Sequence, residues 1–243
     1  MNFTRALIVA ALLNASTACN RSDPPAEQLK RAAEDIVAKE TGAAVPQQST
    51  GPYAPRNECA AAPGASEFLA DLRRAVEKRD AAALVANAAE DVKLDFGGGA
   101  GVAEFRKRLE AEDGSLWRSL DELMTLGCAS DGNATLTLPW VFAQDTITIE
   151  GTEAMIVTGQ NMPLLKAAGE GAPEIARISW DVVRFLPDMN GPQDFARVEW
   201  TDAESQKIEG FIARKNLRSL IDYRLEAAKR NDRWRIVSFV AGD

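Results

Sequence analysis

The sequence predicts an α+β protein, in which helices and an antiparallel sheet form one unit and a small all-β unit precedes the last hairpin of that sheet. Three patterns predict this class. Apolar residues recur at helical spacing between residues 66 and 126, short alternating runs separated by turn residues fill 154–220, and residues 223–241 alternate like the strands of a hairpin. A chain of 243 residues can bury the cores of one or two such units.

The composition is that of a globular protein with an acidic balance. Hydrophobic residues make up 46% and charged residues 26%, and the formal net charge is −8, which does not favour a nucleic-acid partner. The chain contains no histidine, the residue most used for proton transfer near neutral pH and the commonest metal ligand. We therefore expect no metal and no cofactor, and a binding protein more than an enzyme, although Asp, Glu, Lys and Tyr remain available for acid–base chemistry.

The first 18 residues have the pattern of an export signal. Arg5 precedes an apolar run over 6–13 that is too short to span a bilayer, and small residues lead up to Cys19. The segment resembles a bacterial lipoprotein signal, although Ser16 stands where that family usually has leucine. The resemblance implies that Cys19 is acylated and that the protein sits on the periplasmic side of a bacterial membrane. The alternative is plain cleavage before Cys19, which leaves a soluble periplasmic protein.

Two cysteines remain if Cys19 is acylated. Cys59 and Cys128 then form a pair in an oxidising compartment, which predicts a disulfide. Such a bond would close a loop of roughly seventy residues, for which chain entropy gives about 4 kcal/mol of stabilisation. The alternative is a pair of buried free thiols.

The next segment, 19–63, is expected to be a helix followed by a linker. Asp23 can cap a helix that ends at Gly42, and residues 43–63 are rich in Pro, Gln, Ser and Gly. Such a linker would hold an anchored domain away from the membrane.

Helices and strands alternate over 64–153. Apolar stripes and capping residues predict helices over 66–79, 81–89, from 102 and from 115 to 127, and alternation predicts strands over 91–96, 135–142 and 146–150. Near the other end of the chain, residues 223–241 read as a hairpin that turns at Asn231 and Asp232.

Residues 154–220 carry turn signals every ten or so residues, which predicts a small antiparallel barrel or sandwich. Strands are expected over 154–158, 164–166, 174–185, 194–200, 208–213 and 215–218. The order Val-Thr-Gly, Pro-Leu, Ile-Ala, Phe-Ala-Arg-Val, Gly-Phe-Ile and Asn-Leu resembles bacterial SH3-like domains, which are appended to exported and cell-wall proteins. The chain departs from them at Ser179-Trp180-Asp181, where a glycine turn is usual.

The flanking segments resemble another fold. Residues 68–112 and the Trp-Arg-Ile-Val-Ser-Phe hairpin over 223–241 are similar to the nuclear transport factor 2-like family, a curved antiparallel sheet wrapped by helices into a cone. The resemblance implies a cone over 64–153 plus 221–243, with the SH3-like barrel over 154–220 inserted before its last hairpin. Insertion is cheap because the ends of a small domain often lie close together.

The cone implies a candidate acid–base pair. Enzymes of the nuclear transport factor 2-like fold often keep such a residue inside the cone, which makes Asp95 with Tyr223 the candidate here. The plainer alternative is that Asp91, Lys93 and Asp95 form a solvated side of a strand. The glycine run over 97–101 lacks the Lys-Ser/Thr of a phosphate loop and is expected to be a strand-to-helix turn.

Three of the five tryptophans are candidates for binding. Trp140 is expected at the mouth of the cone, and Trp180 and Trp200 lie in the SH3-like stretch, where aromatic faces commonly stack on peptides or sugars. The alternative for each is a place in the core, as expected for Trp117 and Trp234.

Together these patterns predict an exported, lipid-anchored protein of the cell envelope. The SH3-like resemblance implies recognition of peptidoglycan or of an envelope protein, without catalysis, and Cys19 would supply the contact with the membrane. Two alternatives remain: a small-ligand-binding protein or enzyme that uses the cone pocket, and a purely structural assembly factor.

Overall fold

The structure of this protein is a computed structural model that describes residues 49–132, 134–188 and 191–242. Residues from Ser49 onward belong to one compact unit. Cys19, the expected signal and the helix expected over 23–42 lie outside the described residues. Within the described ranges, no helix is long and apolar enough to cross a membrane.

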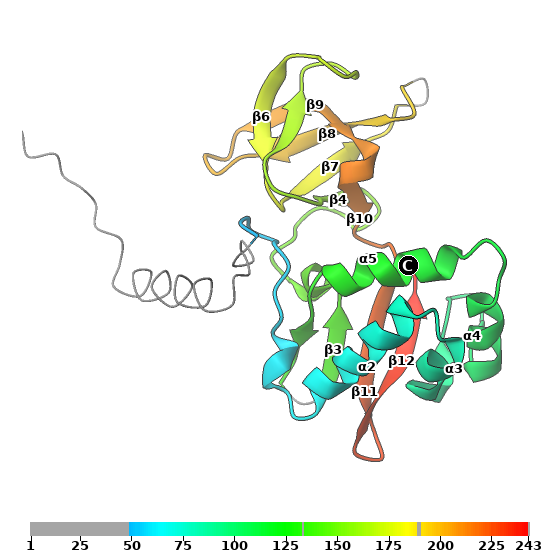
Figure 1. The fold of residues 1–243 in the computed structure, drawn as a ribbon. Helices are drawn as coiled ribbons and strands as arrows, with labels where there is room; N and C mark the ends of the chain where they lie inside the picture. The colour runs from blue at the N-terminus through cyan, green and yellow to red at the C-terminus, as the bar shows by residue number, and fades with distance from the viewer. Residues whose placement is uncertain (1–48, 133, 189–190, 243) are drawn as a thin grey trace, which may run out of the picture. The chain divides into compact units, whose positions relative to one another are not determined.

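The described chain has the predicted α+β architecture, with helices and two separate sheets (Figure 1). The helices are η1 (Cys59–Ala61), α2 (Ala65–Glu77), α3 (Ala81–Ala86), α4 (Val102–Leu109), α5 (Ser115–Thr125), η2 (Trp140–Ala143) and η3 (Arg214–Asn216).

One sheet has five strands and the other has seven. The order in the first is β1 (Ala88–Lys93), β12 (Arg233–Val240), β11 (Arg224–Arg230), β3 (Thr135–Leu138) and β2 (Ala129–Ser130). The order in the second is β10 (Leu217–Ser219), β4 (Ala154–Val157), β7 (Val182–Leu186), β8 (Phe195–Thr201), β9 (Lys207–Ala213), β5 (Met162–Leu165) and β6 (Glu174–Ile178). All pairs are antiparallel except β1 with β12.

The hairpin β11–β12 forms the middle of the five-stranded sheet and turns where the sequence predicts. Asn231 and Asp232 have φ values of 51° and 61°. A two-residue turn that matches the twist of the strands requires a positive φ at both positions, and Asn and Asp tolerate it best after glycine.

Helices α2 and α5 lie across one face of this sheet (Figure 1). The space between helices and sheet is filled by side chains that are at most 1% exposed, among them Phe105, Leu120, Leu136, Leu225 and Phe239. The tryptophans expected in the core belong to this cluster. Trp117 donates its indole N–H to the Leu109 carbonyl (2.7 Å) and Trp234 to the Pro63 carbonyl (2.9 Å).

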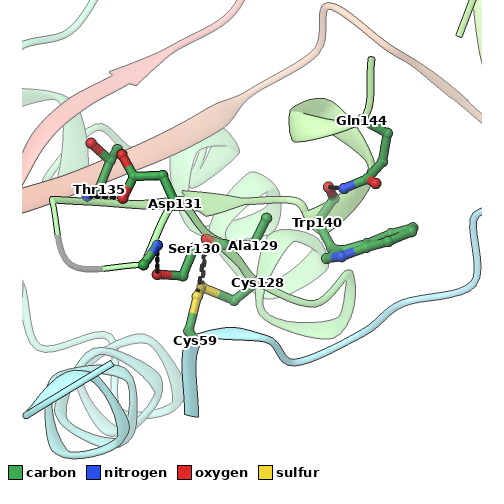
Figure 2. The surroundings of a disulfide bond; sticks show 9 residues. Cys59, Cys128, Ala129, Ser130, Asp131, Thr135, Trp140 and Gln144 are labelled. Atoms are coloured by element: carbon green, nitrogen blue, oxygen red, sulfur yellow. Dashed lines mark hydrogen bonds between the residues drawn. A yellow bond between two sulfur atoms is a disulfide. The ribbon is translucent and has the colours of Figure 1, made fainter. Parts of the chain in front are cut away.

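The cysteine pair forms the predicted disulfide (Figure 2). The Cα atoms of Cys59 and Cys128 are 5.7 Å apart across a separation of 69 residues. Both residues belong to the cluster between the helices and the five-stranded sheet. The alternative of two free thiols is therefore wrong.

Several element boundaries differ from those the sequence predicts. The helix expected over 81–89 ends at Ala86, because residues 88 and 89 belong to β1, which pairs with β12 from Ala88 onward. The strand expected over 135–142 ends at Leu138, because Pro139 has no N–H to donate to a ladder and a short 3₁₀ helix follows.

Two further strand predictions are wrong, one over 146–150 and one over 174–185. Residues 146–150 form no strand, and the Glu150 carbonyl accepts turn hydrogen bonds from the backbone N–H groups of Glu153 and Ala154. The run 174–185 is broken into β6 and β7, because Trp180 adopts a left-handed conformation with φ 44°.

Candidate functional site

The reversal between β6 and β7 carries a half-buried tryptophan on a constrained backbone. The Trp180 N–H donates to the Gly159 carbonyl (2.9 Å), and the Trp180 carbonyl accepts from the Tyr53 N–H (2.8 Å). A left-handed conformation costs a non-glycine residue on the order of 1 kcal/mol or more and persists only where its surroundings fix it. Hydrogen bonds from two other segments fix it here.

Gly51 allows the segment before β1 to approach this reversal. A Cβ atom at Gly51 would lie 2.0 Å from the Ser179 carbonyl oxygen, and its φ of 139° is itself unfavourable for other residues. Only glycine therefore permits this approach. Tyr53 is thereby placed beside Trp180, in an apolar cluster that also contains Ile156.

A second tryptophan is tied to the same reversal. The Trp200 indole N–H donates to Asp181 Oδ2 (2.8 Å), while Asp181 Oδ1 accepts from the Val182 N–H (2.8 Å). Because Asp181 follows Trp180 directly, one side chain connects the reversal to Trp200 on β8. The structure thus brings two of the three predicted binding tryptophans to one place.

Amide and hydroxyl groups lie beside these aromatic rings, together with the Asp181 carboxylate and the Arg177 guanidinium, which donates to the Asn161 carbonyl (3.2 Å). Gln160 Nε2 donates to Thr50 Oγ1 (2.8 Å), and the Asn161 N–H donates to Ser179 Oγ (2.8 Å). Asn161 is exposed and has φ 54°, so two left-handed non-glycine residues lie at this point of the sheet. We call the set Tyr53, Gln160, Asn161, Ser179, Trp180, Asp181 and Trp200 the Trp180 corner.

The chemistry of the Trp180 corner is that of a recognition surface. Tryptophan and tyrosine rings offer flat apolar faces with a polar edge, and amides and hydroxyls can both donate and accept hydrogen bonds. None of the groups in the corner is arranged as a nucleophile with a base. The corner can therefore stack and hydrogen-bond a sugar or a peptide.

Trp140 lies behind the corner, not at a mouth. Trp140, drawn in Figure 2, is 3% exposed. It belongs to the same apolar cluster as Trp180 and Tyr53. The Arg56 guanidinium carbon lies 4.5 Å from the centre of its ring, and its indole N–H is buried without a hydrogen-bond partner. Its ring supports the corner and offers no face to solvent.

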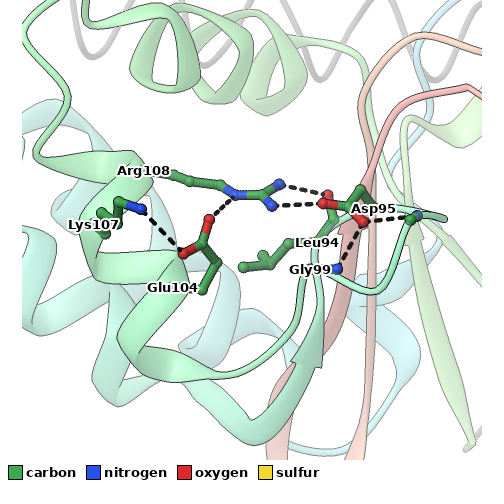
Figure 3. Close-up of polar contacts among 7 residues, drawn as sticks. Leu94, Asp95, Gly99, Glu104, Lys107 and Arg108 are labelled. Atoms are coloured by element: carbon green, nitrogen blue, oxygen red, sulfur yellow. Dashed lines mark hydrogen bonds and ion pairs between the residues drawn. The ribbon is translucent and has the colours of Figure 1, made fainter.

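Asp95 holds a loop together (Figure 3). Its Oδ1 atom accepts from the N–H groups of Gly97 (2.8 Å) and Gly99 (2.7 Å), and Arg108 donates to Oδ2 (2.5 Å). The hydrogen bond from Arg108, followed by that from Gly99, lowers the pKa of Asp95 below its usual value of 3.8. A carboxylate with a lowered pKa is a weak general base at neutral pH.

The same geometry accounts for one glycine of the run. A Cβ atom at Gly99 would lie 2.1 Å from Asp95 Oδ2, so any other residue there would have to displace the carboxylate from this position. Glu104 on α4 accepts a hydrogen bond from Arg108 Nε (2.9 Å), which fixes the guanidinium from the other side (Figure 3).

Tyr223 has different neighbours from Asp95. Its ring centre is 4.7 Å from that of Phe239, and its carbonyl accepts from Arg218. No hydrogen bond joins Tyr223 to Asp95 in the described ranges of the chain. The pair implied by the cone resemblance is thus not assembled as a donor and acceptor.

The described residues offer no group of three or more His, Cys, Asp or Glu side chains that could hold a metal ion. Cys19, the candidate for lipidation, lies outside the described residues.

Sequence reasoning missed Tyr53, Gln160 and Asn161. Tyr53 lies in a segment with the composition of a linker, and the other two follow Gly159 in what reads as an ordinary turn. The usable signal was that Gly-Gln-Asn invites left-handed backbone conformations.

Comparison with known proteins gives no family for this chain. No protein-family model matches it, and no curated protein matches it. Three solved structures with remote likeness each share 10% identity with it. A variant of Rd1NTF2_05 has a TM-score of 0.28, with 73% of this chain and 96% of that chain covered.

The other two are natural proteins. A protein of unknown function with a cystatin-like fold from Nostoc punctiforme has a TM-score of 0.25, covering 72% of this chain and 85% of that one. A putative calcium/calmodulin dependent protein kinase II association domain from Xanthomonas campestris has a TM-score of 0.27, covering 79% and 98%. Likeness at this level assigns neither family nor function.

Proposed function

We propose that this chain is an exported binding protein of the bacterial cell envelope, which holds peptidoglycan or an envelope protein at the Trp180 corner and catalyses no reaction. The composition of the corner carries the proposal. Aromatic faces from Trp180 and Tyr53 stand beside amide and hydroxyl groups, as sugar and peptide ligands require. The resemblance of residues 154–220 to bacterial SH3-like domains points to the same ligands.

The disulfide supports a location outside the cytosol. Bonds such as Cys59–Cys128 persist in the periplasm and outside the cell and are rare in the reducing cytosol. Together with the signal-like first 18 residues, the disulfide favours export. Acylation of Cys19 would then tie the protein to a membrane, and plain cleavage would leave it free in the periplasm.

The charges of the seven-stranded sheet support neutral recognition. Arg197 pairs with Glu209 (2.5 Å), Lys207 with Glu199 (2.9 Å) and Arg177 with Glu174 (2.8 Å). Because these basic side chains are paired with carboxylates on the sheet surface, stacking and hydrogen bonds to amide, hydroxyl and Asp181 groups are left to select the ligand at the corner.

Two observations favour binding over the alternative, an enzyme or small-ligand carrier that uses the cone. Large apolar side chains such as Phe105 and Phe239 fill the space between helices and sheet, where such a pocket would lie. Asp95, the candidate acid–base residue, is engaged by Arg108 and two glycine N–H groups.

Cosedimentation of the purified protein with cell-wall sacculi tests the proposal. We expect saturable binding, and we expect Trp180→Ala to weaken it by at least about tenfold, since truncating a buried aromatic anchor commonly costs more than about 1 kcal/mol. Phe96→Ala serves as the matched control, because it removes an exposed aromatic ring from the loop after β1, outside the corner. Absence of binding by the wild type, or equal binding by Trp180→Ala, would refute the proposal for peptidoglycan.

A further inference from the structure

Arg224 is a buried cation without an ion-pair partner among the described residues. It begins β11, it is 8% exposed, and its Nη1 atom is buried without a hydrogen bond. No hydrogen bond or ion pair joins the Arg224 side chain to any residue in 49–132, 134–188 or 191–242, although its backbone pairs with Val240 on β12. The guanidinium cannot lose its proton in a protein, so it carries its full charge there.

The surroundings of Arg224 are aromatic and cationic. The guanidinium carbon lies 4.6 Å from the centre of the Phe142 ring and 5.5 Å from that of Phe96. Lys93 places its ammonium 4.0 Å from the centre of the same Phe96 ring. Two cations therefore share one exposed phenyl ring.

These side chains occupy the face of the five-stranded sheet that the helices leave uncovered. Leu225, the next residue, is fully buried in the cluster under the helices, so Arg224 points to the opposite face. Lys93 pairs with Ser238 and Ser238 with Glu226, which places them in one row across the sheet. Glu226 accepts from Ser238 Oγ (3.1 Å) and forms no ion pair with Arg224.

A second buried arginine, Arg218, has the carboxylate partners that Arg224 does not have among the described residues. Arg218 is 7% exposed, and it contacts Asp222 (2.9 Å), Glu122 (3.5 Å) and the Tyr223 carbonyl. The chain can therefore supply carboxylates to a buried guanidinium, and it does so six residues before Arg224 (224 − 218 = 6).

The aromatic rings do not replace those partners. A cation–π contact contributes about 0.5 to 2 kcal/mol, whereas an unpaired buried charge costs several kcal/mol. The rings also accept none of the hydrogen bonds that five N–H groups offer in good geometry. No carboxylate among the described residues forms an ion pair with this guanidinium, so its charge is not compensated within that part of the chain.

Phe96 is the exposed neighbour of Arg224. The residue is 48% exposed, and it is followed by three glycines, of which Gly98 has φ 101° and open space around it. Because exposed side chains change rotamer within nanoseconds, the Phe96 ring can turn away from the guanidinium at little cost.

We propose that Arg224 and Lys93 form a binding site for a carboxylate carried on an apolar or aromatic group. The guanidinium fork matches a carboxylate in two parallel hydrogen bonds. Lys93, Arg224 and Glu226 sum to +1 (two cations minus one carboxylate), which one carboxylate neutralises and a phosphate dianion would exceed. The Phe96 and Phe142 rings both lie close to the guanidinium and suit a planar, apolar body for the ligand.

The test measures the binding of sodium benzoate to the full chain by calorimetry, and its effect on Tm by thermal unfolding. We expect saturable binding and a rise in Tm with benzoate, and no rise with benzamide, its neutral isostere, or with sodium chloride at the same ionic strength. Equal effects of benzoate and chloride would mean that the site takes any anion and would overturn the proposal.

The variant Arg224→Leu distinguishes a ligand-binding role of Arg224 from a purely structural role between the two phenyl rings. Arg224→Leu should weaken benzoate binding by at least about tenfold and, without benzoate, unfold at the wild-type temperature or above, because it removes an unpaired buried charge. A lower Tm for Arg224→Leu together with no response of the wild type to benzoate would assign Arg224 a structural role only.

Lys93→Gln covers the case in which Arg224→Leu does not fold. Lys93 is exposed, so the variant should keep the wild-type Tm and bind benzoate several-fold more weakly. Unchanged affinity would remove Lys93 from the site and with it the proposal. Because the Trp180 corner lies on the other sheet, binding to sacculi should not change in either variant.

Discussion

The two sheets handle their charged side chains in opposite ways. On the seven-stranded sheet, basic residues lie against carboxylates of neighbouring strands, as in the pairs Arg197–Glu209 and Lys207–Glu199. On the β11–β12 hairpin of the five-stranded sheet, Arg224, Arg230, Arg233 and Arg235 form no ion pair with any described residue. Where the basic side chains are already paired with carboxylates, a ligand is bound mainly through aromatic rings and uncharged hydrogen-bonding groups. Where the basic side chains have no carboxylate partner, an anionic ligand is favoured.

The hairpin also stands out against the rest of the chain. Residues 224–235 carry five basic and two acidic side chains, a net +3, so the remaining chain has −11 (−8 minus +3). Arg230 and Arg233 are direct cross-strand partners beside the turn. Like charges on directly opposite strand residues destabilise a sheet. A role in binding an anion would account for their presence here.

The two sheets also differ in covalent support, because the disulfide Cys59–Cys128 lies in the core of the five-stranded sheet. Removing this disulfide should change the free energy of unfolding more than any other substitution proposed below. Cys59→Ser with Cys128→Ser should lower the free energy of unfolding by roughly 4 kcal/mol, measured by urea denaturation, since the loop of 69 residues becomes unconstrained. Amide hydrogen exchange should rise in β2, β3 and β11 more than in β8 and β9. Equal loss of protection in both sheets would show that they unfold as one.

A pair of substitutions at Trp180 isolates the strain of the corner. Trp180→Gly should be more stable than Trp180→Ala by about 1 kcal/mol in urea denaturation, because glycine adopts a φ of 44° without cost. The matched pair lies on β8, where the backbone is extended and Trp200→Gly should be less stable than Trp200→Ala. The same order at both positions would contradict the role assigned to the backbone of the corner.

Reversing one charge on each sheet tests the contrast directly. Arg230→Glu should raise the free energy of unfolding by about 0.5 kcal/mol, because it turns a like-charged pair with Arg233 into an ion pair. Arg197→Glu should lower it, because it places a second carboxylate beside Glu209. Thermal unfolding at low salt measures both, and two changes of the same sign would break the comparison.

The smallest expected effect concerns the acid side of the pH range. The pKa of Asp95 is lowered in the folded protein, so its contribution to stability is present above its ordinary value of 3.8 and is lost as pH falls below 3.8 through the lowered pKa. The urea midpoint of the wild type should therefore exceed that of Asp95→Asn at about pH 6, with the gap narrowing towards about pH 2. The carboxyl side chain is 38% exposed, so solvent screening keeps the gap modest. A gap that does not change with pH would show that ionisation of Asp95 contributes nothing to stability.

The parts of the fold that could be predicted rest on local rules. The α+β class followed from periodicity, the hairpin from Asn231-Asp232, and the disulfide from the cysteine count. The parts that could not be predicted depend on contacts between distant segments. Tyr53 joins the corner through a backbone hydrogen bond to Trp180, and its own segment has the composition of a linker.

The candidate site was predictable to a similar degree. The sequence pointed to Trp180 and Trp200, but the hydrogen bond that joins them through Asp181 requires the register of β7 and β8. Asp95 looked like a residue inside a cone, and its partner Arg108 lies 13 residues further on. The isolation of Arg224 has no sequence signal, because it depends on which carboxylates the fold brings near.

Binding to sacculi as a function of salt tests the central contrast most directly. If the Trp180 corner recognises its ligand through aromatic and neutral groups, affinity of the wild type should hold within about twofold between roughly 50 and 300 mM sodium chloride, where exposed charges become screened. Trp180→Ala should lack that binding at every salt concentration. Binding that falls steeply with salt and persists in Trp180→Ala would contradict the account and place recognition on the unpaired cations of the hairpin.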